Sequence, residues 1–497
     1  MSQRQWNTTS RARWWSAALL GVGGLALAGC AVGPRYSRAP APTPPEYKEL
    51  PPNWKTAQPS DQISKGKWWE LYQDAQLNAL EERISVSNQT LKTAQAQFEQ
   101  ARALVRQTRS AYYPTVTGGV IATRNHASAH RPFGSSSPSN TYTDLILGLD
   151  ASYEVDVWGR VRRTVEAARA NAQASAADLE SVSLSLHAEL AYDYFQLHTL
   201  DTEAQLLDST VVAYAKALEL TQNRYTGGIA SQVDVAQAQT QLETTRAQAI
   251  DVRVQRAQVE HAIAVLVGQP ASTFSLPTAP PANTPPVIPV GLPSDLLERR
   301  PDIGSNERQM AQANALIGVA KAAYYPTITL TASGGFEGST ISNWFSGPSG
   351  FILGGASALV TAFDAGRRRA VNDQAESFYD QTVANYRQSV LAAFQDVEDN
   401  LAALRILEEE AQTQQAAVAA AERSLTLSNN RYKGGVATYL EVILAQSIAL
   451  NDQRTEVEIA GRRMGASVLL IKAIGGGWTT AKLPMVENQS PRQPAGQ

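Results

Sequence analysis

The sequence predicts a mixed α and β membrane protein with two internal repeats, each containing strands followed by very long helices. Three observations support this prediction. Segments of the first half of the chain recur in the second half. Residues 161–222 and 367–430 contain neither proline nor glycine. Before the first of these stretches, apolar and polar residues alternate with a period of two.

Residues 1–29 predict a lipoprotein signal peptide. Three arginines precede an apolar run, Ala17 to Ala28, which is too short to span a bilayer. The run ends in "LALAGC", which resembles the bacterial lipobox and contains Cys30, the only cysteine of the chain. We therefore expect Cys30 to carry a lipid anchor. An ordinary signal peptide that happens to contain a cysteine is the alternative.

The start of the mature chain predicts an extended tether. Residues 30–66 are rich in proline and lead away from the lipid anchor. Removal of residues 1–29 leaves 40 basic and 46 acidic residues, a balance that disfavours nucleic-acid binding. No other segment has 18 consecutive apolar residues, so we expect no transmembrane helix.

Two halves of the chain share one pattern. The segment "FEQARALVRQTRSAYYPT" (98–115) matches "MAQANALIGVAKAAYYPT" (310–327) at nine of eighteen positions. A proline-rich linker, 270–293, separates the halves. The sequence therefore predicts repeat 1 over 67–269, repeat 2 over 294–474 and a C-terminal tail over 475–497.

Each repeat contains a segment with the character of strands. In repeat 1 a helical segment stops at Pro114, and strands are expected over about 115–158. Within it, "TDLILGLDASYEVDVWG" places apolar and acidic residues on opposite faces, as in an outer-membrane barrel with lipid outside and water inside. A strand of a soluble sandwich is the alternative. The corresponding region, about 327–366, alternates less regularly.

Long helices are expected after the strands of each repeat. Their ranges are 161–226 and 231–267 in repeat 1, and 367–433 and 438–474 in repeat 2. At 1.5 Å per residue, the longer ones reach roughly 90 Å. Helices of this length exceed an ordinary globular domain and suggest packing side by side in the wall of a cylinder.

A nine-residue motif joins the two long helices of each repeat. It appears as "NRYTGGIAS" from Asn223 and as "NRYKGGVAT" from Asn430. The paired glycines predict a helix end and a tight turn. The spacings Ser231-x-x-Asp234 and Thr438-x-x-Glu441 then predict a capping box at the start of each following helix.

These motifs together resemble those of the TolC-like outer-membrane efflux proteins. The resemblance rests on the lipobox followed by "VGPRY", the repeated "AYYPT", the string "LPSDLLERRPDI" and the paired NRYxGG turns. It is closest to the lipoprotein branch that serves RND pumps (OprM/NodT type). It implies a homotrimer in which four strands per chain form one 12-stranded outer-membrane β-barrel, continued by a long periplasmic α-helical barrel. Four strands alone leave open edges in lipid, so some oligomer is required in any case.

The resemblance also implies a function, a location and partners. The chain is expected to be a passive, gated channel in the cell outer membrane, exporting small molecules with a periplasmic adaptor protein and an RND-type inner-membrane pump. In the family, acidic residues near the turns line the narrow periplasmic tip, and neighbouring Tyr and Arg side chains hold the helices together. Six carboxylates of a trimer would then form a cation-selective ring. The expected gate residues are Arg224, Tyr225, Asp234, Arg431, Tyr432, Tyr439 and Glu441. Capping alone remains an alternative role for the two carboxylates.

Two arginine clusters begin the long helices, where the helix dipole disfavours cations. We expect them to contact lipid phosphates at the membrane surface. A solvated charge cluster is the alternative. The clusters are Arg160, Arg162 and Arg163, and Arg367, Arg368 and Arg369.

Enzyme chemistry finds little support in the sequence. The chain has no P-loop, GxSxG, HExxH or CxxC motif. His126 and His130 fall in an expected external loop, and His187 and His198 lie too far apart to chelate one ion. We therefore expect no catalysis, no metal and no cofactor. A lipid-anchored periplasmic coiled-coil scaffold without a pore is the competing function.

Overall fold

The computed structural model describes residues 31–49, 67–126, 128, 141–278, 285–288 and 295–478. The predicted signal peptide and Cys30 lie outside these residues. So do most of the expected C-terminal tail and parts of the tether and the linker.

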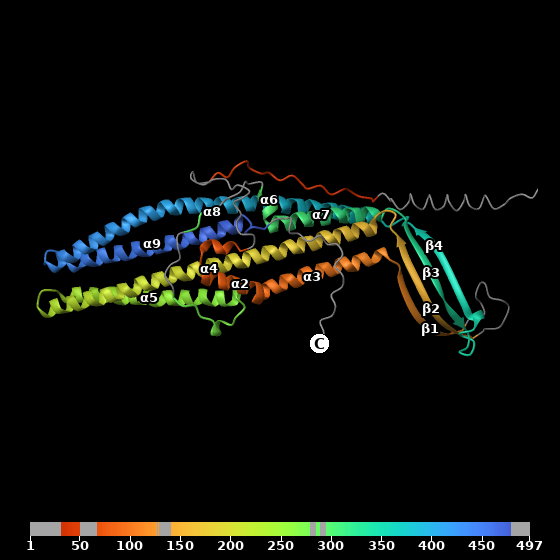
Figure 1. Ribbon diagram of the computed structural model, residues 1–497, viewed down its shortest axis with the longest axis horizontal. Helices are drawn as coiled ribbons and strands as arrows, with labels where there is room; N and C mark the ends of the chain where they lie inside the picture. The colour runs from red at the N-terminus through yellow and green to blue at the C-terminus, as the bar shows by residue number, and fades with distance from the viewer. Residues whose placement is uncertain are drawn as a thin grey trace, which may run out of the picture.

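Helices form one long body, and a sheet extends from one end of it (Figure 1). The elements of the first half are η1 (Trp68–Tyr72), α2 (Ala75–Ser87), α3 (Gln89–Arg109), η2 (Ser110–Tyr112), β1 (Thr115–His126), β2 (Thr141–Val155), α4 (Arg160–Thr226), α5 (Gln232–Leu266) and η3 (Ala271–Thr273). Those of the second half are α6 (Leu296–Arg299), α7 (Pro301–Ala322), β3 (Thr327–Gly338), η5 (Gly347–Ser349), β4 (Gly350–Leu359), α8 (Arg367–Lys433) and α9 (Tyr439–Ala473). The long helices end within one residue of the ranges expected from the sequence.

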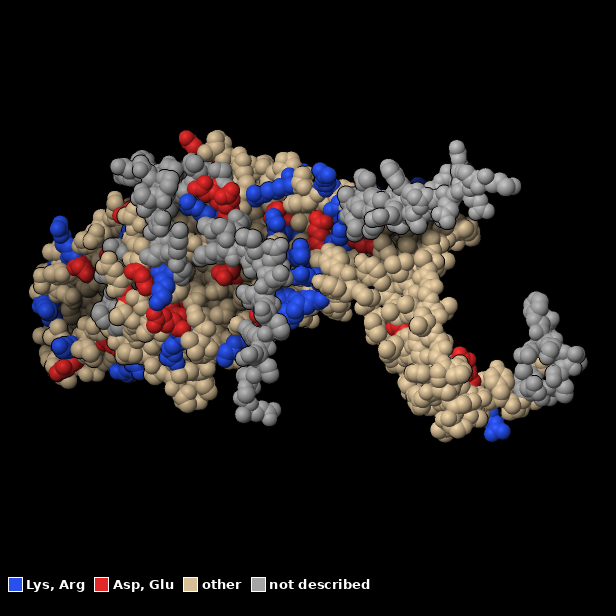
Figure 2. Space-filling view, turned by 45° about the vertical axis from the view of Figure 1, so that its right-hand side comes forward, with Lys and Arg blue, Asp and Glu red and all other residues tan. Residues whose placement is uncertain are grey.

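The four strands form one antiparallel sheet in the order β1-β2-β3-β4. Leu149 of β2, for example, lies opposite Gly118 of β1 and Gly334 of β3. No strand residue is buried within the chain. The sheet surface in Figure 2 is largely free of Lys, Arg, Asp and Glu. A sheet with few charges, exposed apolar side chains and two unpaired edges is incomplete by itself.

The long helices show the internal duplication in three dimensions. α4 and α8 each have 67 residues, and α5 and α9 each have 35. α8 begins and ends 207 residues after α4, and α9 begins and ends 207 residues after α5. An ion pair in each hairpin repeats with the same offset, because Arg256 binds Asp201 in repeat 1 and Arg463 binds Glu408 in repeat 2.

The main hydrophobic core lies where the short N-terminal helices pack on the middle of α4. Trp68, Leu77 and Ile84 are fully buried there against α4, which contributes Leu190 and Leu197. This core ties the long helices together about halfway along the body (Figure 1). It positions the hairpin turns at one end and the sheet at the other.

The described part of the expected tether is extended but bound to the helices. The backbone N–H of Val32 donates to the Trp158 carbonyl at 3.0 Å. The Pro34 carbonyl accepts hydrogen bonds from Arg163 and Asn314 at 3.1 and 3.2 Å. Residues 31–49 are therefore an extended segment that hydrogen bonds hold against α4 and α7. Because the extended, proline-rich backbone does not use its own carbonyls in a helix or sheet, these carbonyls can accept hydrogen bonds from buried side-chain donors of α4 and α7.

Candidate functional site

The two hairpin turns lie at the end of the helical body farthest from the sheet (Figure 1). In each, the second glycine has a left-handed backbone, with φ of 73° at Gly228 and 74° at Gly435. The N–H of Ile229 donates to the Arg224 carbonyl at 2.8 Å, and the N–H of Val436 donates to the Arg431 carbonyl at 3.0 Å. These bonds satisfy carbonyls at the helix ends and fix both turns in one shape.

The carboxylates that follow the turns have different partners. Asp234 completes a capping box: its Oδ2 accepts from the Ser231 N–H at 2.9 Å, and its own N–H donates to Ser231 Oγ at 3.2 Å. The second predicted capping box is wrong, because the Thr438 side chain makes no capping bond. Glu441 instead lies 3.3 Å from Arg431. Both side chains of this pair are largely exposed, so it contributes little stability.

Three of the residues expected at the gate form one cluster between the hairpins. The Arg224 guanidinium lies over the Tyr432 ring, 4.7 Å from its centroid, and donates to the Lys433 carbonyl at 3.2 Å. The Tyr432 and Tyr439 rings lie 5.1 Å apart and are buried. Burial raises the pKa of Tyr439 to about 12, so its hydroxyl stays neutral. The cluster joins the end of α4 to both helices of the other hairpin.

Tyr225 lies outside this cluster. It occupies the position in repeat 1 that Tyr432 occupies in repeat 2, but its exposed fraction is 45%, against 6% for Tyr432. The sequence could not separate the two tyrosines, because their flanking motif is the same. Tyr432 is covered by residues of the first hairpin, Arg224 and Ala238.

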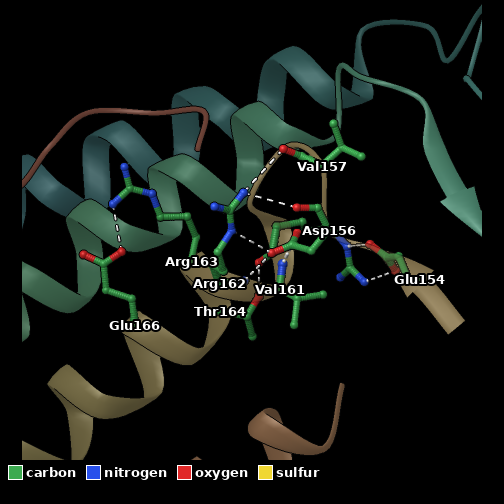
Figure 3. Close-up of polar contacts among 9 residues, drawn as sticks. Glu154, Asp156, Val157, Val161, Arg162, Arg163, Thr164 and Glu166 are labelled. Carbon is green, nitrogen blue, oxygen red and sulfur yellow. Dashed lines mark hydrogen bonds and ion pairs between the residues drawn. The ribbon is translucent and has the colours of Figure 1, made fainter. Parts of the chain in front are cut away.

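The first arginine cluster is paired with carboxylates of its own chain (Figure 3). Asp156 accepts from the N–H groups of Val161 and Arg162 at 2.9 and 2.8 Å, and its Oδ2 also binds Arg162 Nε at 3.2 Å. Arg160 binds Glu154 through Nε at 2.8 Å. The carboxylate at the N-terminus of α4 therefore compensates the helix dipole and the arginines together.

The third member, Arg163, is buried and binds Glu166 at 2.8 Å in addition to the Pro34 carbonyl. Lipid is therefore not needed to explain why arginines occur at the start of α4. A local signal was available in the sequence, since Glu154 and Asp156 lie a few residues before the cluster.

The second cluster is only partly compensated. Asp364 binds Arg368, through Nε at 2.7 Å and through the backbone N–H at 3.2 Å. The Arg368 guanidinium also lies 5.5 Å from the centre of the Tyr324 ring. The side chains of Arg367 and Arg369 are exposed.

An aromatic pair marks the junction between sheet and helices, which the sequence analysis did not identify. Trp158 and Tyr325 stack with ring centroids 4.7 Å apart. The indole N–H of Trp158 donates to the Pro326 carbonyl at 2.9 Å. Ala31 packs against Gly159 beside this pair. A Cβ added to Gly159 would lie 3.0 Å from the Ala31 Cα. Trp and Tyr are the aromatic residues enriched at membrane–water interfaces.

His126, His187 and His198 contact other side chains of the fold. His126 contacts Thr141 at 2.8 Å, and His130 lies outside the described residues. His187 binds Glu81 at 2.6 Å in a buried pair, where burial lowers the pKa of His187 to about 4 and raises that of Glu81 well above its usual range. His198 is buried beside the Tyr194 ring.

Among the described residues, no group of three His, Cys, Asp or Glu side chains is arranged to hold a metal ion. None of the described helices is long and apolar enough to cross a membrane.

A model of the Outer membrane efflux protein family matches the chain over two segments, residues 80–269 and 292–476. The chain belongs to this family. The two segments fall on either side of the proline-rich linker, and each contains one strand pair and one long helical hairpin.

Relatives in this family are similar over nearly their whole length. The solvent efflux pump outer membrane protein SrpC of Pseudomonas putida is 32% identical over 473 residues, which cover 92% of this chain and 97% of SrpC. The cation efflux system protein CusC of Escherichia coli is 30% identical over 458 residues, covering 91% of this chain and 97% of CusC.

A solved structure shares the architecture described above. The outer-membrane channel OprN superposes with a TM-score of 0.85 at 27% sequence identity, covering 90% of this chain and all of that one. The arrangement of a four-stranded sheet and long paired helices is therefore that of an outer-membrane channel of this family.

Proposed function

We propose that the chain is the outer-membrane channel of an efflux system, a passive conduit through which small molecules leave the periplasm. The observation that carries this proposal is the sheet. It has two unpaired edges, no buried residue and few charges, and it continues directly into helices 67 residues long. In hydrocarbon, such edges must be closed by further strands. A periplasmic scaffold without a pore would not need this sheet.

Three copies per channel are the number that the resemblance to this family implies. Four strands are too few for a barrel, whereas three chains supply twelve, a size that leaves a lumen. The same threefold assembly places the paired helices in a tube below the barrel. No catalytic group is required, because an RND-type pump in the inner membrane, connected through an adaptor protein, would supply the energy.

The anchor and the interface complete the proposed placement. Ala31 lies at the aromatic junction, so a lipid on Cys30, the residue before it, would enter the membrane beside the barrel.

Arg367 and Arg369 begin α8 at the same end of the helical body. Their side chains are exposed, and they are the arginines best placed for lipid phosphates. Replacing both with Gln is expected to weaken binding of anionic lipid to the purified protein. Arg162→Gln is the matched control, since Arg162 is engaged by Asp156.

Asp234 and Glu441 are proposed to line the narrow periplasmic end. Both lie in the first turn of the helix that follows the Gly-Gly turn. Asp234 can cap α5 through one carboxylate oxygen and still present its second oxygen to ions. In planar bilayers, wild-type protein is expected to show small, cation-selective currents. Asp234→Ala with Glu441→Ala is expected to raise conductance and reduce cation selectivity.

Glu243→Ala serves as the control for this experiment. Its carboxylate lies farther along α5 and binds Arg246 at 2.8 Å, so its loss is expected to leave conductance unchanged. If neither the wild type nor the double variant conducts, the channel proposal fails. If the protein conducts but the double variant has the same conductance and cation selectivity as Glu243→Ala, the gate assignment fails while the channel proposal stands.

A further inference from the structure

The four helices that are joined to the strands enclose a groove. α4 packs against α3 and α7, and α7 packs against α8, which gives one layer in the order α3-α4-α7-α8. The groove has a volume of about 820 Å³, and residues of all four helices line it. A hollow that reaches both outer helices of a layer lies on the side toward which the layer curves. Its size is that of a site for a drug-sized molecule.

The tether marks the opposite side of this layer. It runs along α7 and α8 (Figure 1), and a Cβ added to Gly33 would lie 2.5 Å from the Cα of Gly318 in α7. Gly318 follows the groove residue Gln309 by nine residues, about two and a half turns, so the two lie on opposite faces of α7. A lipid on Cys30 would lie outside the barrel, so the tether covers the outer face of the tube. The groove then faces the lumen, a step that rests on the proposed function.

Amide side chains dominate the lining of the groove. Gln97 and Gln100 of α3 recur as Gln309 and Gln312 of α7, with the offset of the repeated AYYPT motif. Four such residues per chain would place twelve amides around the lumen of a trimer. Each amide can both donate and accept hydrogen bonds and carries no charge. The amides therefore suit many polar groups, and any selectivity must come from the other side chains of the groove.

Two side chains of the groove depart from the repeat. Phe378 of α8 corresponds to Asn171 of α4, and its ring is 42% exposed. Asp178 of α4 corresponds to Asn385 of α8. Among the residues that line the groove, Asp178 alone is ionisable and Phe378 alone is aromatic. The Ser305 hydroxyl of α7 donates a hydrogen bond to Asp178, and partial burial raises the pKa of this carboxyl.

These two groups have complementary partners in an aromatic organic cation. The carboxylate attracts the positive charge, and a cation also restores part of the hydration that this group has lost. The face of the phenylalanine ring attracts a cation and packs against a planar apolar ring system. A hard metal ion is a poorer fit, because it needs several oxygen ligands and Asp178 is the only carboxylate of the groove. An anion would be repelled.

We infer that this groove is a luminal binding site for an aromatic organic cation, in which Asp178 pairs with the charge and Phe378 contacts the ring system. Because both side chains occur once per chain, each chain holds one site and a trimer holds three. Cargo of this class would be retained at the wall between the hairpin turns and the barrel, whereas uncharged cargo would pass it with little retention.

Two probes of equal shape test the inference. N-methylphenanthridinium and phenanthridine share one ring system, and the first carries a fixed positive charge. Binding to the purified full-length protein in an uncharged detergent is measured by isothermal titration calorimetry. The cation is expected to bind once per chain and at least tenfold more tightly than phenanthridine. Equal affinity for the two probes would show that the groove does not select cations and would overturn the inference without any variant.

Variants assign the two contacts. Asp178→Asn is expected to weaken binding of the cation at least tenfold and to leave phenanthridine binding unchanged. Phe378→Leu is expected to weaken binding of both probes at least threefold. Glu180→Gln is the matched control, because it removes the same charge two residues farther along α4, on the face turned away from the groove. An equal loss in Asp178→Asn and Glu180→Gln would reduce the effect to net charge and would contradict the site.

Cysteine labelling tests where the cation binds. Gln100→Cys lies in the groove, and Gln95→Cys is an exposed control about 140° around α3. Saturating N-methylphenanthridinium is expected to slow labelling of Gln100→Cys at least fivefold and to leave Gln95→Cys unchanged. The unmodified chain gives the background, since Cys30 is the only native cysteine. Equal protection of both positions, or of neither, overturns the site. A protein that conducts but fails these tests keeps the proposed function, whereas one that passes them without conducting loses it.

Discussion

The contact between α4 and α9 makes Gly461→Ala a test with a predictable sign. In an isolated helix this change stabilises by about 1 kcal/mol, because glycine is a poor helix former. Here the new Cβ would lie 2.5, 2.8 and 3.1 Å from the Oγ1, Cγ2 and Cβ atoms of Thr199. Rotation of Thr199 cannot relieve this overlap cheaply, since its hydroxyl donates to the Phe195 carbonyl at 2.9 Å. Such overpacking costs roughly 1–3 kcal/mol, so we expect net destabilisation of about 1 kcal/mol.

The assay is thermal unfolding of the detergent-solubilised protein, followed by far-UV circular dichroism. For a chain of this length, 1 kcal/mol corresponds to a Tm shift of roughly 1–2 °C. Thr199→Ala is the matched background, because it removes the two closest atoms. In that background Gly461→Ala is expected to raise Tm, as helix propensity alone predicts. A rise in Tm on the wild-type background would show that α4 and α9 are not in close contact and would refute the reasoning.

Three further predictions concern stability. Gly435→Ala should cost about 1–2 kcal/mol, because φ is 74° there, while the neighbouring Gly434→Ala, at φ −76°, should be nearly neutral in thermal unfolding. Arg300→Ala should cost about 1–2 kcal/mol in the same assay, because it leaves the Ala473 carbonyl without this donor, whereas the partly exposed carboxylates of Asp302 and Asp396 can be hydrated. Burial raises the pKa of Asp193 to about 6, so its contribution to stability is lost as pH rises from 4 through 6; Asp193→Asn should raise Tm at pH 7 and have little effect at pH 4.

Much of the fold follows from local signals in the sequence. The helix ends could be predicted because the Gly-Gly turns need a left-handed residue that few other side chains adopt. The strand β2 could be predicted from its period of two, since one face must differ chemically from the other. The repeat fixed the remaining elements by analogy, so the less regular β4 was expected where it occurs.

The parts that the sequence analysis missed depend on contacts between residues far apart in the sequence, or on which of two possible partners a side chain binds. Thr438 makes no capping bond, although its motif is as suitable as that of Ser231, and Glu441 pairs with Arg431 instead. The binding of residues 31–49 to α7 and α8 leaves no periodic pattern, because it depends on single carbonyls such as that of Pro34. Arg224 was expected at the tip, but the ring over which it lies could be known only once the hairpins were placed side by side.

Single-particle electron microscopy of the purified, lipid-embedded protein tests the central claim most directly. That claim is that copies of this chain enclose a continuous pore. The account predicts a particle of three chains, with twelve strands closing one barrel and a lumen that runs from it between the long helices. A monomer, or an assembly whose helices pack into a solid bundle with no lumen, would contradict it.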